Sequence, residues 1–136
     1  MAVIYRVESS PSYLPIVEPF FSSLAAGAFR AVTSVITLME VAVGLLRLED
    51  FALADDYEAL LVRFPNLTIV DVDRTITRRA AELRAAHRLR PADALHAATA
   101  LVAGANYFLT NDRTLSRIPG IRVLLLDSYL PPAGRP

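Results

Sequence analysis

The apolar residues of this chain follow two alternating patterns, short β-rich runs and longer stretches with helical spacing. Short runs bounded by turn residues predict strands, and apolar residues that recur every three or four positions predict helices. Strands are expected over residues 30–34, 67–72, 107–110 and 122–126, and helices over residues 13–27, 37–46, 53–64, 74–87, 91–103 and 114–117. Residues 3–8 fit either a strand or one short helix. Strands that alternate with helices predict an α/β domain with a mainly parallel central sheet and helices on both faces.

Two of the predicted helices have distinctive apolar faces. Residues 37–46 are apolar nearly all round, which predicts burial between layers. The helix after it is amphipathic, with one apolar stripe made by Leu53, Tyr57, Leu60, Leu61 and Phe64.

No repeat or linker divides the chain, so we expect one domain over residues 1–130 and a disordered Pro-rich tail over residues 131–136.

Composition and charge narrow the function classes only slightly. The 136 residues are 54% hydrophobic, which suits one domain with a real core. No apolar run approaches the roughly 18 residues of a membrane span, and the amino terminus shows no secretory signal. Cysteine is absent, which fits a cytoplasmic protein. The net charge is 0, so overall charge gives no support for nucleic-acid binding, although all 14 basic residues are arginine.

Three acidic residues are predicted near the ends of elements where ligands bind in α/β sheets. Asp93 lies in the first turn of the helix that Pro91 begins, Asp112 follows the strand 107–110, and Glu40 lies one turn into the helix after the strand 30–34. Each has a structural alternative. Glu40 completes a capping box with Thr37, Asp93 matches ordinary helix-dipole chemistry, and Asp112 or Asn111 would cap the following short helix.

Taken together, these carboxylates suggest a cation site. Three carboxylates at one sheet edge repel each other unless a cation lies among them. Oxygen ligands suit Mg²⁺ or Mn²⁺, and such an ion activates water for attack on a phosphodiester.

Three stretches resemble the motifs of the PIN domain family, specifically the VapC-type toxin ribonucleases. They are residues 91–96 (PADALH), residues 110–113 (TNDR) and residues 33–41 (TSVITLMEV), and the similarity extends from about Val3 to about Leu126. The resemblance implies a PIN-like three-layer α/β/α fold and a metal-dependent endoribonuclease that is homodimeric. It also implies an antitoxin partner whose tail occupies the acidic groove. Asp93 and Asp112 would be metal ligands and Glu40 a ligand or its neighbour, with Thr110 and Asn111 in support.

One element of the family pattern is not visible. The family begins with a strand that ends in a metal-binding Asp, and here Val3–Ile4–Tyr5 resembles the helix that follows it, so the strand and its Asp would fall before Met1. We therefore expect the first strand to be absent. Its central slot would then be empty, filled by residues 1–5, or covered by another copy of the chain. The alternative function is a PIN-like module that binds RNA or an antitoxin with weak or no catalysis. A third function is that of another metal-dependent phosphohydrolase acting at the same sheet edge.

Several other polar residues have a structural interpretation beside a functional one. His87 and His96 are interpreted as structural, with His96 on a helix face or in a dimer contact. Asp71 and Asp73 fit a strand end followed by a helix cap. Five arginines would line an RNA groove or form a solvated face: Arg84, Arg88, Arg90, Arg113 and Arg117. Of these, Arg90 and Arg113 are the candidate RNA contacts.

Overall fold

A computed structural model describes residues 2–5, 14–110 and 113–125 of the chain. The strands are β1 (Ala2–Tyr5), β2 (Arg30–Ser34), β3 (Leu67–Val70), β4 (Tyr107–Thr110) and β5 (Val123–Leu125). The helices are α1 (Leu14–Ala25), α2 (Ile36–Arg47), α3 (Phe51–Arg63), α4 (Arg74–His87), α5 (Pro91–Val102) and the 3₁₀ helix η2 (Arg113–Arg117). Every strand and helix predicted from residue 13 onward is therefore present, with ends that shift by a few residues.

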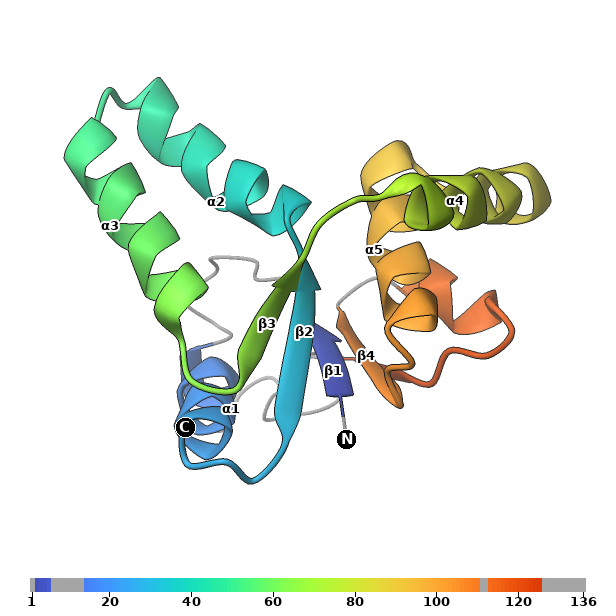
Figure 1. Cartoon of the computed structure of the whole chain (residues 1–136), viewed down its shortest axis with the longest axis horizontal. Helices are drawn as coiled ribbons and strands as arrows, with labels where there is room; N and C mark the ends of the chain where they lie inside the picture. Colours follow the sequence, from blue (N-terminus) through green and yellow to red (C-terminus); the bar gives the residue numbers. More distant parts are fainter. Residues whose placement is uncertain (1, 6–13, 111–112, 126–136) are drawn as a thin grey trace, which may run out of the picture.

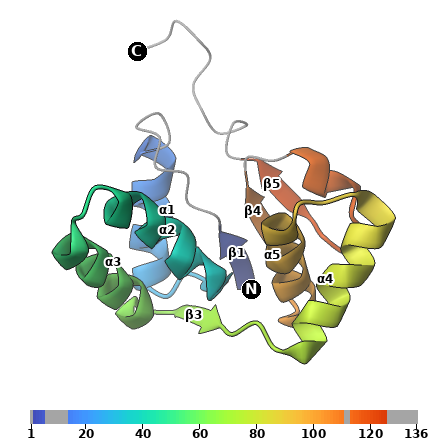
Figure 2. The same ribbon diagram turned by 90° about the horizontal axis from the view of Figure 1, so that it is seen from above.

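The strands form a five-stranded sheet in the order β3-β2-β1-β4-β5, and every pair in it is parallel. All carboxyl ends of the strands thus lie at one edge (Figure 1). Seen from above, α1, α2 and α3 lie on one side of the sheet, and α4 and α5 lie on the other (Figure 2). This is the three-layer α/β/α arrangement that the sequence predicts.

The central position of the sheet is filled by the chain's own first residues. β1 pairs with β2 through Ala2 and Arg30, and with β4 through Val3 and Tyr107. The expectations that residues 3–5 match a helix and that the first strand is absent are therefore wrong. β-Branched and aromatic residues favour a strand, and a strand here satisfies the backbone groups of β2 and β4 that a helix would leave unpaired. The expected slot of a missing strand is therefore also wrong, because residues 2–5 themselves form an intact central strand.

The main core lies between α4, α5 and the β4 side of the sheet. α5 brings small residues to this core, among them Ala94, Ala97 and Ala98, which are fully buried. Small side chains let a helix approach the sheet closely, and Phe108 of β4, only 1% exposed, fills the space beneath. The remaining members of the cluster are Ile76, Ala80, Leu83, Leu89, Ala100, Leu115 and Ile118.

Local sequence signals determine where the helices on this side begin and end. Asp73 caps α4, because its carboxylate accepts a hydrogen bond from the Ile76 amide at 2.8 Å. Pro91 occupies the first turn of α5, where its missing N–H costs no helical hydrogen bond. After α5, Gly104 adopts a positive φ of 71°, which a side chain would disfavour. The predicted cap at Asp73 and the helix start at Pro91 are thus confirmed.

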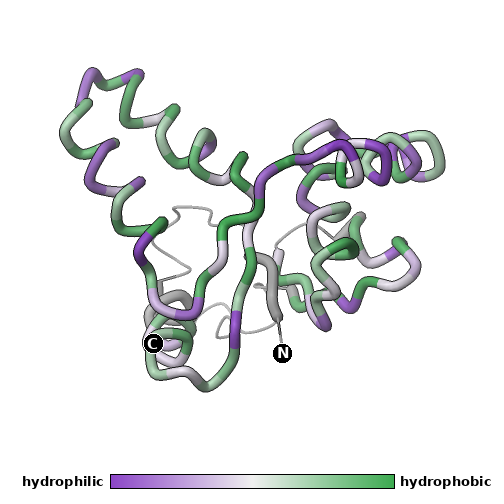
Figure 3. Tube along the Cα trace, in the orientation of Figure 1, coloured by the Kyte–Doolittle hydropathy of each residue, from purple (hydrophilic) through white to green (hydrophobic). Residues whose placement is uncertain are grey.

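The α2–α3 hairpin is more exposed than its sequence suggests. The prediction that residues 37–46 are buried between layers is wrong, since Met39 is 61% exposed and Val43 and Leu46 are also exposed. On α3, only Ala54 is buried. Figure 3 shows hydrophobic residues along α2 as far as the outer end of the hairpin. The reason is geometric: α2 packs mainly against β2 and α3 and touches α5 through Glu40, which leaves Met39, Val43 and Leu46 exposed. None of the described helices is long and apolar enough to cross a membrane.

Candidate active site at the carboxyl edge of the sheet

Chain direction places Asp93 at the carboxyl edge of the sheet. α5 ends at Val102 and a short turn leads directly into the amino end of β4. α5 therefore begins at the opposite edge, where the strands end, and Asp93 lies in its first turn. The Asp93 residue is only 6% exposed. The amino end of a helix favours a carboxylate, so this position stabilises a buried negative charge.

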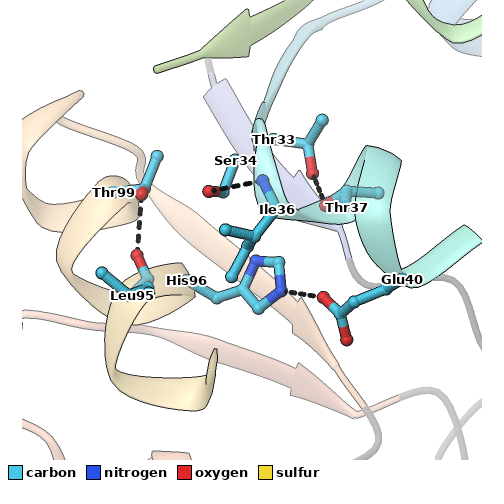
Figure 4. Close-up of polar contacts among 8 residues, drawn as sticks. All are labelled: Thr33, Ser34, Ile36, Thr37, Glu40, Leu95, His96 and Thr99. Atoms are coloured by element: carbon cyan, nitrogen blue, oxygen red, sulfur yellow. Dashed lines mark hydrogen bonds and ion pairs between the residues drawn. The ribbon is translucent and has the colours of Figure 1, made fainter. Parts of the chain in front are cut away.

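Glu40 reaches the same region from α2, the helix that follows β2. Its Oε1 lies 2.5 Å from Nε2 of His96 on α5, a hydrogen bond between residues 56 positions apart (Figure 4). The side chain of Glu40 is 26% exposed and that of His96 is 1% exposed. Glu40 is thus partly buried, as its apolar neighbours predict, and the imidazole provides the polar partner that burial requires.

The capping-box alternative for Glu40 is wrong. The residue at the N-cap of α2 is Val35, whose side chain makes no cap hydrogen bond. Thr37 instead shares a hydrogen bond of 2.7 Å with the hydroxyl of Thr33, at the end of β2 (Figure 4). With its predicted capping partner engaged elsewhere, Glu40 is turned toward α5.

Buried hydroxyls line the strand ends beside these acids. Ser34, the last residue of β2, is fully buried, and its Oγ accepts a hydrogen bond from the Ile36 amide at 3.3 Å. Thr110, the last residue of β4, is 1% exposed. The strand ends therefore provide small polar groups at the edge where the carboxylates lie.

The remaining predicted site residues are placed only in part. Asn111 and Asp112 lie outside the described residues. Arg113 begins η2, and Arg90 is exposed at the N-cap position of α5, where its side chain makes no cap hydrogen bond. Within residues 2–5, 14–110 and 113–125, no three His, Cys, Asp or Glu residues lie close enough to hold a metal ion. The structure thus brings Glu40 and His96 into contact and sets Asp93 one turn before His96 on α5.

Sequence reasoning missed the role of His96, which it interpreted as a helix-face or dimer-contact residue. The imidazole is instead an internal partner of Glu40. One signal was present: His96 follows Asp93 by three positions and so shares its helix face. Small residues surround it on α5, and a large polar ring among them has to point toward another polar group.

A hollow of about 710 Å³ lies at the opposite edge of the sheet. It is lined by Ala105, Asn106, Tyr107, Gly120, Ile121 and Arg122. These residues precede or begin β4 and β5, so the hollow is separate from the acidic residues at the carboxyl edge.

The sequence matches the model of the PIN domain over residues 17–121, which is most of the chain, and the protein belongs to this family. A search of curated proteins gave no significant match. Three solved structures with a similar fold are toxin–antitoxin complexes. A chain of VapBC2 from Rickettsia felis, bound to a DNA fragment from its promoter, matches with a TM-score of 0.69 and 18% identity, over 91% of this chain and 97% of that one.

Two further similar structures are also chains of toxin–antitoxin complexes. A chain of DNA-bound VapBC from Salmonella typhimurium matches with a TM-score of 0.63 and 23% identity, over 92% of this chain and 97% of that one. A chain of a toxin–antitoxin complex from Klebsiella pneumoniae matches with a TM-score of 0.59 and 21% identity, over 89% of this chain and 95% of that one. At these identities the similarity concerns the fold.

Proposed function

We propose that this protein is a VapC-type toxin, a metal-dependent endoribonuclease that hydrolyses RNA phosphodiester bonds at the carboxyl edge of its sheet. The observation that carries the proposal is the buried carboxylate of Asp93 at the amino end of α5, with Glu40 held against the same helix. Membership of the PIN domain family and the similarity to chains of toxin–antitoxin complexes support it.

Asp93, Asp112 and Glu40 are the proposed ligands of Mg²⁺ or Mn²⁺. The donor set fits such an ion, because carboxylate oxygens are the ligands that hard divalent cations prefer. When bound, the ion supplies an activated water and stabilises charge on the phosphate. Thr110 and Asn111 orient these ligands or the phosphate, and Arg90 and Arg113 contact the RNA backbone through their guanidinium groups.

The competing function is a PIN-like module that binds RNA or an antitoxin with weak or no catalysis. One observation favours it: the first aspartate of the sequence is Asp50, so no aspartate follows β1 closely. The aspartate that the family places after its first strand is therefore not found there, and the nearest acidic residue after β1 is Glu8.

Cleavage of a structured RNA by the purified chain separates these two functions. With Mn²⁺ or Mg²⁺ present, we expect endonucleolytic products that disappear when a chelator is added and return when the ion is restored. RNA that the chain retains in a gel-shift assay but leaves intact with either ion would support the binding module instead.

The proposed protein partner is an antitoxin that covers the exposed apolar surface of the α2–α3 hairpin. Met39, Val43 and Leu46 make an i, i+4, i+7 stripe on α2, and Leu53, Tyr57 and Leu60 make one on α3. Exposed stripes with this spacing are typical of surfaces that bind a partner helix. The similar solved structures are complexes with such partners.

The homodimer and the cytoplasmic location stay predictions.

A charge placed in this surface should weaken the complex. In co-expression with the cognate antitoxin, Leu60→Glu is expected to lower recovery of the complex at least about tenfold, since burying an unpaired carboxylate in an apolar interface is costly. Ala59→Glu, an exposed position off the stripe of the same helix, is the matched control and should leave recovery unchanged. Equal recovery of the Leu60→Glu and Ala59→Glu complexes would place the antitoxin elsewhere.

A further inference from the structure

The contact between His96 and Glu40 joins two helices, and its histidine is buried. His96 lies inside α5 with 1% of its side chain exposed, and its Nε2 is 2.5 Å from Oε1 of Glu40 on α2. A carboxylate oxygen only accepts hydrogen bonds, so Nε2 carries the proton and donates. Figure 4 shows the imidazole pointing from α5 toward α2, with the second carboxylate oxygen of Glu40 directed away from the ring.

The other ring nitrogen has no comparable contact. Nδ1 of His96 is buried and has no hydrogen-bond partner among the described residues. An apolar side chain would fill the same space without leaving a buried polar atom unpaired, which is destabilising. Packing alone therefore does not explain a histidine here. The contact with Glu40 does explain it. That contact needs a hydrogen-bond donor at the tip of the residue 96 side chain, and Nε2 of His96 supplies it. His96 has no other polar side-chain partner in the described part of the chain.

We propose that His96 is a positioning residue that fixes the carboxylate of Glu40 for cation binding, an inference that rests on the proposed metal-dependent function. Glutamate has three side-chain torsions, and a partly exposed one loses conformational freedom whenever it binds an ion. The hydrogen bond to His96 restricts those torsions before the ion arrives. It also joins α2 to α5, so it sets Glu40 relative to Asp93, one turn earlier on α5.

Mn²⁺ affinity of the purified full chain, measured by calorimetry without RNA, tests this role. Groups that orient metal ligands change metal affinity by about 10–100-fold when they are removed. We expect His96→Leu to bind Mn²⁺ at least about tenfold more weakly than the unmodified chain. His96→Gln places an amide N–H near the position of Nε2 and should bind within about threefold of the unmodified chain. In a Glu40→Gln background, His96→Leu should cause little additional loss.

Thermal unfolding and one control variant separate positioning from general destabilisation. Thr99→Val removes another buried polar group of α5, whose hydroxyl bonds the Leu95 carbonyl, away from Glu40. It should lower the melting temperature and leave Mn²⁺ affinity unchanged. Unaltered affinity in a folded His96→Leu variant would overturn the positioning role alone, as would equal losses in the Leu and Gln variants. Absence of Mn²⁺ binding by the unmodified chain would overturn the metal-dependent function and this inference with it.

Discussion

Replacing Asp93 with asparagine is expected to lower metal-dependent RNA cleavage at least about 100-fold. The amide has nearly the same size and shape as the carboxylate, so the packing at the start of α5 is kept, but the negative charge that would hold the ion is lost. Groups that merely orient a ligand cost about 10–100-fold when removed, and loss of a ligand should exceed that. The measurement is the initial cleavage rate of one structured RNA at saturating Mn²⁺.

Asp73→Asn is the matched control for this variant. Asp73 is exposed and caps α4 through its bond to the Ile76 amide. Asparagine caps helices about as well as aspartate, so both stability and the cleavage rate should stay within about twofold of the unmodified chain. If Asp93→Asn keeps more than a tenth of the original rate while Asp73→Asn behaves as expected, Asp93 is not a metal ligand in this protein.

The sequence was most informative where local signals agree with the tertiary fold. Asp73, Pro91 and Gly104 mark helix ends through backbone chemistry that needs no distant partner, and the structure has those ends where they were expected. The alternation of strands with helices likewise predicted a parallel sheet, whose carboxyl edge then gathers residues from separate elements. Asp93 could be placed at that edge by this reasoning alone.

Where local patterns are ambiguous, the sequence was misleading. Residues 3–5 are too few for periodicity to distinguish a strand from a helix, and pairing with β2 and β4 decides the outcome. The apolar residues of α2 predicted burial, yet they carry no signal that tells a core contact from an exposed surface. The bond from His96 to Glu40 spans 56 positions, and neither residue type reveals a partner so distant in sequence.

Phe108→Ala should cause one of the largest losses of stability in the chain. Phe108 is 1% exposed on β4, the strand between β1 and β5, and packs in the core beneath α5. Truncating a buried phenylalanine costs about 3–5 kcal/mol, which is a large part of the 5–15 kcal/mol that stabilises a typical domain. Urea unfolding should show a lower midpoint with a similar slope.

The neighbouring residue provides the control for that loss. Tyr107 lies on the opposite face of β4 and is only half-buried, so Tyr107→Ala should cost less than half as much as Phe108→Ala. Equal losses would mean that the core does not depend on α5 packing over β4.

Phe108 and Thr110 share one face of β4, so a cavity at Phe108 lies close to the end of the strand that leads to Asn111 and Asp112. Cleavage by Phe108→Ala should therefore fall steeply with temperature, whereas the loss in Asp93→Asn should be the same at every temperature at which the chain is folded.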